Sequence, residues 1–301
     1  MNRSSMRHLV TFQYIEAITR AGSIRKAAED MNITASALNR RIQRFEEEFG
    51  SEIFERLPRG VRLNPAGELL IRHIRAQESD LKRVQSQVAD LSGVRRGHVS
   101  IACSQALVPY FLPQQIAEYR KAHPGVTFSV SVRDREAAEA ELGTFKSDIA
   151  LVFEPIFMAD FQVQAMVPQT ISTIMRPDHP LARQKIVRLR DCLDFACVLP
   201  ESQYGVRFLI ERAAAESSRI ISPIVESDSF DFMRHYALHE DAIAFQIPIG
   251  LEERDDLVCR ELSTDDVPSG NLLLGQMRGR TLPVASARFM QQLEIELQKY
   301  T

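Results

Sequence analysis

The chain has 301 residues, of which 45% are hydrophobic and 26% charged, as is typical of a folded protein with two or three domains. No apolar run reaches the roughly 18–20 residues that a membrane helix requires, and the N-terminus does not resemble a signal peptide. The four cysteines are few, so buried thiols in a cytoplasmic protein are the simplest expectation.

Charge is distributed unevenly along the chain. Residues 1–96 carry 17 Lys and Arg against 12 Asp and Glu, whereas residues 97–301 carry 20 against 28. The formal net charge of −3 therefore combines a basic N-terminal part with an acidic remainder. This asymmetry is typical of a nucleic-acid-binding module joined to a separate regulatory part.

Two short helices joined by a sharp turn are predicted near the N-terminus. Ser23 can cap the first helix and Thr34 the second, because short hydroxyl side chains accept the free N–H groups of a helix start. Asn32 lies between them and tolerates the left-handed conformation that a sharp turn requires. The pattern predicts a helix-turn-helix, and an ordinary helical hairpin is the alternative.

The second helix has an apolar face and a polar, basic face. Helical spacing places four residues on the predicted core side: Leu38, Ile42, Phe45 and Phe49. The candidate DNA-contacting residues of this segment are Thr34, Ala35, Ser36, Asn39, Arg40, Gln43 and Arg44.

A short basic hairpin is predicted directly after this helix. The apolar pair Ile53 and Phe54 precedes a turn at Pro58 and Gly60. The arginines on either side of the turn are Arg56, Arg59 and Arg62. A basic hairpin beside a recognition helix is placed to contact phosphates, as a wing does.

The stretch from Gly22 to Leu70 resembles the winged helix-turn-helix of LysR-type transcriptional regulators. The family's motifs are matched by Gly22-Ser23, Ala27-Ala28, Thr34, Phe45-Glu46-Glu47 with Gly50, and Ile53-Phe54-Glu55-Arg56. The segment Asn64-Pro65-Ala66-Gly67 replaces the family's Thr-Glu-Ala-Gly. The chain departs from the family at the reading positions, with Ala35-Ser36 for Gln-Pro and Asn39 for Ser. The resemblance implies sequence-specific DNA binding at an operator of its own.

A long helix is predicted from Asn64-Pro65, where Asn caps and Pro occupies the first turn. Apolar residues then recur in a heptad series that only Gln77 interrupts. The predicted dimerisation residues are Leu70, Ile74, Leu81, Val84, Val88 and Leu91. The alternative is a single helix packed on its own domain. The resemblance also implies dimerisation through this helix.

The acidic remainder alternates between strands and helices, which predicts parallel sheets with crossover helices. The expected strands cover residues 98–104, 126–132, 147–153, 170–177, 194–200, 220–227, 241–248 and 271–277. The expected helices cover residues 106–125, 135–146, 207–216, 229–239 and 283–300. The region resembles, more loosely, the effector domains of the same family, which are built like periplasmic binding proteins.

The predicted fold class is α/β with an N-terminal all-α winged helix-turn-helix and a C-terminal two-lobed, periplasmic-binding-protein-like effector domain. The predicted domains are residues 1–63 for DNA binding, 64–92 for the linker helix and 93–301 for effector binding. Within the last, lobe I is expected at about 97–165 and 268–301 and lobe II at about 166–267.

An effector site is expected between the lobes, at the carboxyl ends of strands. Carried over by position from the family, the candidates are Ser104, Gln105, Phe153, Ser202, Tyr204, Ser229 and Gln246. Serine hydroxyls at helix N-termini suit a small carboxylate. An aromatic pocket is an open alternative, formed by Phe153, Phe157, Tyr204 and Phe230. Packing or capping could also explain each residue taken alone.

The sequence predicts no catalytic residue, no cofactor and no metal. It contains no GxGxxG after a strand, no GxxxxGK[ST], no HExxH and no GxSxG. His235 and His239 could share one helix face, but no further ligand motif supports a metal site. Cys192 and Cys197 suggest a redox switch, which we reject because the loop "ESQYGVR" lacks the reactive Cys of peroxide-sensing members.

A ligand-responsive transcription regulator is therefore the prediction. The expected partners are double-stranded operator DNA, a small organic acid or aromatic effector, further copies of the chain as homodimer or homotetramer, and RNA polymerase. No membrane partner is expected. The alternatives from other classes are an α/β enzyme, which would turn over metabolites, and a constitutive DNA-architectural protein, which would bind DNA without sequence or ligand dependence.

Overall fold

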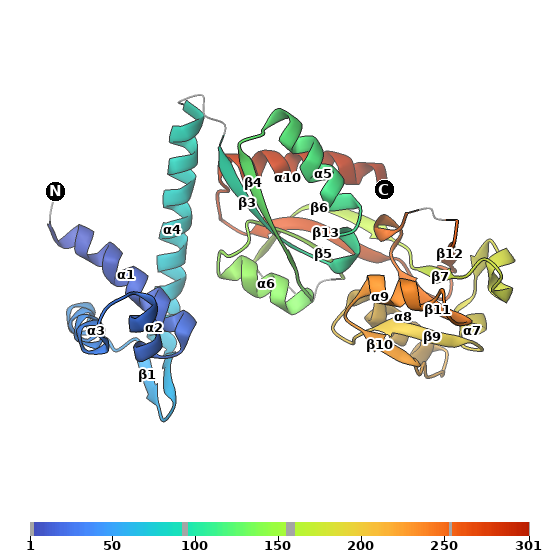
Figure 1. The fold of residues 1–301 in the computed structure, drawn as a ribbon, viewed down its shortest axis with the longest axis horizontal. Coiled ribbons are helices and arrows are strands. Elements are labelled where there is room, and N and C mark those ends of the chain that lie inside the picture. The colour runs from blue at the N-terminus through green and yellow to red at the C-terminus, as the bar shows by residue number, and fades with distance from the viewer. Residues whose placement is uncertain (1–2, 92–95, 155–159, 253–254, 301) are drawn as a thin grey trace. The chain divides into compact units, whose positions relative to one another are not determined.

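The chain divides into two compact units, Met1–Leu81 and Lys82–Thr301. The computed structural model describes residues 3–91, 96–154, 160–252 and 255–300 (Figure 1). Each unit has hydrophobic core clusters of its own, so each is packed independently. No helix among the described residues is long and apolar enough to cross a membrane.

The first unit is a winged helix-turn-helix. Its elements are α1 (Arg3–Ala21), α2 (Ile24–Asp30), α3 (Ala35–Phe49), β1 (Phe54–Leu57), β2 (Gly60–Leu63) and the first part of α4 (Pro65–Leu91). The Ser23 hydroxyl accepts the Lys26 N–H at 3.5 Å, and the Thr34 hydroxyl accepts the Ala37 N–H at 3.3 Å. Asn32 has a φ of 54°. The predicted caps and the left-handed turn are therefore confirmed.

The core of this unit contains the predicted stripe of α3 except for its last member. Leu38, Ile42 and Phe45 are buried, whereas Phe49 is 48% exposed. The Phe49 ring stacks on the Phe45 ring, with centroids 5.5 Å apart. The prediction that Phe49 lies in the core is wrong, because α3 ends at this residue and the ring packs along its own helix.

The hairpin β1–β2 is attached to the turn between α1 and α2. The Val61 N–H donates to the Gly22 carbonyl at 2.9 Å. Gly60 has a φ of 147°, and a Cβ at this position would lie 2.3 Å from the same Gly22 oxygen. Only glycine fits this close approach, so Gly60 fixes where the hairpin sits.

Helix α4 starts as predicted, but its first heptad residues lie in the core of the first unit and not on an exposed seam. The Asn64 side chain accepts the Gly67 N–H at 2.8 Å, which confirms the N-cap. Leu70 and Ile74 are 7% and 0% exposed inside the core of the first unit. Their assignment to a dimer seam is wrong, because this chain's own domain already covers them. Leu81, Val84 and Val88 are exposed by 53%, 44% and 57%.

The second unit contains two sheets, and the first has the strand order β4-β3-β5-β13-β6. This lobe consists of β3 (Gly97–Cys103), α5 (Phe111–Ala122), β4 (Val126–Val132), α6 (Arg135–Gly143), β5 (Ile149–Phe153), β6 (Phe161–Gln169), β13 (Gly270–Met277) and α10 (Val284–Leu297). Helices α5 and α10 cover one face of the sheet and α6 the other (Figure 1). Both faces are buried, as the apolar runs of the inner strands require.

The second sheet has the strand order β10-β9-β11-β7-β12-β8. Its lobe consists of β7 (Ser172–Met175), β8 (Ile186–Val187), α7 (Leu189–Cys192), β9 (Ala196–Pro200), α8 (Gly205–Glu216), β10 (Val225–Ser227), α9 (Phe230–Tyr236), β11 (Ala242–Gln246) and β12 (Val258–Leu262). The chain passes between the lobes after β6 and again before β13. The predicted domain boundaries stay predictions.

Both sheets are mixed rather than wholly parallel, which corrects the expectation. β13 runs antiparallel to β5 and β6, and β7 runs antiparallel to β11 and β12. The sequence analysis missed β6, β8 and β12. β6 carries Pro168 and lies at the sheet edge, where proline is tolerated because one side of the strand has no neighbour. Helix α5 begins at Phe111, after a short helical turn at Gln105–Leu107, and so later than predicted.

Candidate functional site

Helix α3 presents its predicted reading face to solvent. Six of the candidates are exposed and Asn39 is half-buried; the exposed ones are Thr34, Ala35, Ser36, Arg40, Gln43 and Arg44. The Thr34 and Ser36 hydroxyl oxygens lie 3.3 Å apart, so one donates to the other. Arg44 forms an ion pair with Glu48 at 2.9 Å. Arg40 is in no ion pair with a described residue and is therefore free to meet a ligand.

The three arginines of the hairpin are all exposed but differ in their partners. Arg62 lies opposite Glu55 across the two strands and forms an ion pair with it at 2.7 Å. Arg56 and Arg59 form no ion pair within the described part of the chain. Arg40, Arg56 and Arg59 thus carry positive charge that no carboxylate of the described residues neutralises.

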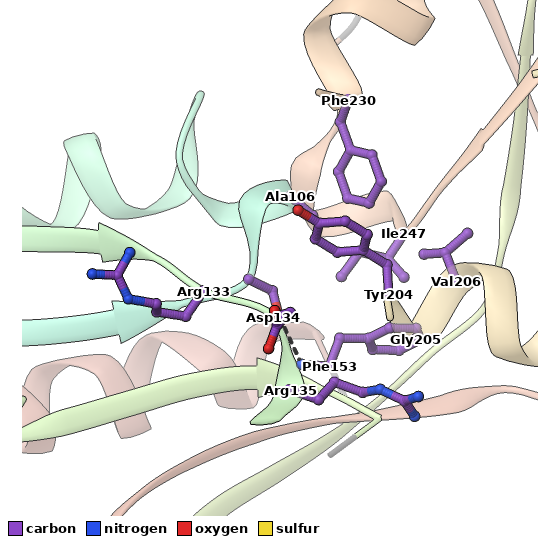
Figure 2. Close-up of a pocket in the computed structure, with 11 residues that line it drawn as sticks. Ala106, Arg133, Asp134, Arg135, Phe153, Tyr204, Gly205, Val206, Phe230 and Ile247 are labelled. Atoms are coloured by element: carbon purple, nitrogen blue, oxygen red, sulfur yellow. Dashed lines mark hydrogen bonds between the residues drawn. The ribbon is translucent and has the colours of Figure 1, made fainter. Parts of the chain in front are cut away.

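A pocket in the second unit gathers side chains from both lobes. Figure 2 shows its walls. The residues that line it are Ser104, Ala106, Arg133, Asp134, Arg135, Phe153, Tyr204, Gly205, Val206, Phe230 and Ile247. The Tyr204 and Phe230 rings contact each other, with centroids 5.8 Å apart and planes inclined by 51°.

The pocket brings together three of the predicted effector residues: Ser104, Phe153 and Tyr204. The Ser104 oxygen accepts the Phe153 N–H at 2.9 Å, which ties the end of β3 to the end of β5. Burial raises the pKa of the Tyr204 phenol, and nearby Asp228, Glu201 and Asp134 raise it further. Tyr204 therefore stays a neutral hydroxyl at physiological pH.

The other four predicted residues do not line the pocket. The Gln105 side chain accepts the Phe230 N–H and so links the two lobes. Ser229 caps α9 by accepting the Phe232 N–H at 3.2 Å. Gln246 is buried and donates to the Gly250 carbonyl at 3.0 Å. Ser202 is exposed to solvent outside the pocket.

The sequence analysis missed three charged lining residues: Arg133, Asp134 and Arg135. They follow β4, and the carboxyl ends of parallel strands meet at one sheet edge, so position could have found them. Asp134 caps α6 through the Ala137 N–H at 2.8 Å. Arg133 forms an ion pair with Glu141 at 2.7 Å. Phe157 lies outside the described residues.

The cysteines are not poised for redox chemistry. Burial raises the pKa of Cys103 to about 12 and that of Cys197 to about 11. Burial also raises the pKa of Cys192, and the neighbouring Cys197 raises it further. Thiols that stay protonated are poor nucleophiles, which supports the rejection of a redox switch.

Family comparison covers both units. The family model described as "LysR substrate binding domain" matches residues 92–298, and "Bacterial regulatory helix-turn-helix protein, lysR family" matches residues 9–68. The chain belongs to the LysR family of transcriptional regulators. It is thus a sequence-specific DNA-binding regulator with an effector-binding domain, as the winged helix-turn-helix and two-lobed α/β fold predicted.

Individual LysR regulators are similar along most of the chain. A RuBisCO operon transcriptional regulator of Allochromatium vinosum is 30% identical over 72% of this chain and 70% of its own length. The transcriptional activator CmpR of a Synechocystis strain is 25% identical over 68% of this chain and 67% of its own length. A full-length OxyR variant from Pseudomonas aeruginosa has the same fold, with a TM-score of 0.69 at 18% identity, covering 97% of this chain and 95% of that one. Full-length CbnR complexed with its target DNA gives a TM-score of 0.63 at 14% identity, covering 97% of this chain and 99% of that one.

Proposed function

We propose that this LysR-family regulator reads its operator with α3 and the hairpin β1–β2, and that a small molecule bound around Ser104 controls it. Asn39 and Arg40 are assigned to base reading, with Thr34, Ala35, Ser36, Gln43 and Arg44 beside them. Arg56, Arg59 and Arg62 are assigned mainly to phosphates. All of these side chains except the half-buried Asn39 are exposed, which supports DNA contact by both elements. The division follows because a major groove admits one helix and a flanking hairpin meets the backbone.

The observation that carries the effector site is the meeting of Ser104, Phe153 and Tyr204 in one pocket lined from both lobes. The Ser104 oxygen already accepts the Phe153 N–H, so its proton is what it offers a ligand. The rings of Phe153, Tyr204 and Phe230 and the hydroxyl donor of Ser104 suit a planar organic molecule with an acceptor group. We therefore propose an aromatic compound or organic acid as the effector.

Assembly through α4 is part of the proposal. Leu81 and Val84 are 53% and 44% exposed on a helix whose earlier heptad residues, Leu70 and Ile74, are buried. Val88 is exposed as well, and the side chain of Leu91 lies outside those described. We propose that these residues pair two protomers, as a homodimer or within a homotetramer. RNA polymerase as a partner and a cytoplasmic location complete the proposal.

A thermal-shift screen of aromatic and organic acids on the full chain tests the effector site. A ligand that binds only the native state raises the melting temperature. Ser104→Ala should weaken a hit by about ten- to a hundredfold, because it removes a hydrogen bond to the ligand. Ser202→Ala is the matched control, since Ser202 is exposed and does not line the pocket. Equal affinity of every hit for wild type and Ser104→Ala would place the effector elsewhere.

A further inference from the structure

We propose that Arg135 is a positioning residue that clasps the two lobes together at the effector pocket. Arg135 is the first residue of α6, and it lines the pocket beside its N-cap Asp134. Its Nη1 donates to the Glu154 carbonyl at 3.1 Å, directly after β5 of the first lobe. Its Nε donates to the Gln203 carbonyl at 3.1 Å, in the loop before α8 of the second lobe.

The guanidinium also packs on the second lobe. Its central carbon lies 5.1 Å from the centroid of the Phe208 ring, on the first turns of α8. Arg212, one turn further along α8, lies 5.5 Å from the same ring. Figure 2 shows the Arg135 side chain extending away from the Tyr204 and Phe230 rings. Arg135 therefore holds the loop before α8 by a hydrogen bond and the first turn of α8 by a cation–π contact.

The acceptors of Arg135 are neutral carbonyls, and it forms no ion pair with a described residue. Arg133, two residues earlier, differs in this respect. Its Nε bonds Glu141 at 2.7 Å and its Nη1 bonds the Val132 carbonyl at 2.7 Å, both in the first lobe. Of these two arginines on the pocket wall, Arg135 alone joins the lobes, so Arg133 is a built-in control.

The segment that Arg135 holds leads directly into one wall of the pocket. Gln203 immediately precedes Tyr204 and Gly205, which line the pocket. The start of α8 is already close to the first lobe, since a Cβ on Gly205 would lie 2.7 Å from the Phe153 carbonyl oxygen. A molecule that wedges between these walls changes the distance that Arg135 spans. The clasp thus couples the pocket to the spacing of the lobes.

The role of the clasp in effector binding rests on the proposed effector site, whereas the contact of Arg135 with both lobes does not. The test of this contact therefore needs no ligand. We would follow amide hydrogen exchange in the full chain without added compound. In Arg135→Gln, exchange of the Tyr204 and Phe208 amides should rise about tenfold, because the loop before α8 opens more often. The Phe230 amide should follow, since it donates to Gln105 across the same lobes.

Two further variants make the result specific. Arg133→Gln should raise exchange only in residues 132–147 of the first lobe, which hold its partners Val132 and Glu141 and the Ser147 hydroxyl that also bonds Glu141. Arg135→Lys should behave like Arg135→Gln, because the compact ammonium lacks the planar, spaced donors with which the guanidinium bonds both carbonyls while it packs on the Phe208 ring. The clasp is refuted if Arg135→Gln changes exchange in α6 alone, or if Arg135→Lys restores full protection. Compounds that bind Ser104→Ala normally would refute the proposed pocket and leave these exchange results standing.

Discussion

The carboxylate of Glu46 accepts the backbone N–H of Ile53 at 2.8 Å, so the last turns of α3 hold the chain that enters the hairpin. The same oxygen lies 3.4 Å from the Phe54 N–H. Ile53 is fully buried, and water cannot replace this acceptor for its amide. Glu46 therefore fixes the hairpin relative to the reading helix, and its role is structural.

We expect Glu46→Ala to lower the stability of the first unit by about 1–3 kcal/mol, because it leaves a buried N–H unpaired. Hydrogen exchange of the Ile53 and Phe54 amides in the full chain measures this. Glu47→Ala is the control, since Glu47 is exposed on the same helix. Similar exchange in the two variants would show that the contact contributes nothing.

Local chemistry made the helix-turn-helix predictable from sequence. The hydroxyls of Ser23 and Thr34 act within three residues of their own position, and the left-handed Asn32 needs no distant partner. Glu46 acts seven residues away across a change of element, and its pairing with Ile53 was not foreseen. Short-range signals were sufficient where the partner is near in sequence.

Apolar spacing alone could not assign the surface that covers α4. A heptad series describes a stripe, and the same stripe packs on its own domain at Ile74 and faces solvent at Leu81. The contacts of Arg135 at the pocket could not be predicted from local sequence patterns either. Its two acceptors lie 19 and 68 residues away, and they meet only when both lobes have folded.

The two halves of this stripe should respond differently to a charge. Leu81→Glu places carboxylates in the proposed seam, so we expect dissociation toward monomers in which the first unit stays folded. Sedimentation over a concentration series measures the oligomer. Ile74→Glu buries a charge in the first unit and should destabilise it by several kcal/mol instead. An unchanged oligomer for Leu81→Glu would move the interface away from this part of α4.

The unpaired arginines of the first unit should divide into two roles. Arg40→Ala should flatten the preference at one base pair, where a bidentate contact is worth roughly 1–3 kcal/mol. Arg59→Ala should weaken all sequences alike and reduce the log–log salt slope by about one. Binding selections from random duplexes at several salt concentrations distinguish the two. A change of preferred base in Arg59→Ala, with uniform loss in Arg40→Ala, would reverse the assignment.

A buried histidine should make the second unit sensitive to acid. The His179 side chain is 2% exposed, and its Nδ1 accepts the Leu181 N–H at 3.2 Å. Burial lowers the pKa of His179 below its usual 6.5; Arg176 lowers it further, and Asp241 and Asp178 oppose the shift. Its Nε2 is buried without a hydrogen-bond partner among the described residues, so the ring is neutral in the folded chain.

The sign of the effect follows from which state binds the proton. Below pH 6.5 the unfolded chain takes up a proton at His179 that the folded chain refuses, so stability falls as the pH drops toward the lowered pKa. One group contributes at most about 1.4 kcal/mol per pH unit. His179→Asn keeps an acceptor for Leu181 but cannot titrate, so its stability should depend less on pH between about 7 and 5. Urea unfolding at each pH measures this, with His73→Gln as an exposed control; parallel curves for His179→Asn and wild type would assign the acid sensitivity to other groups.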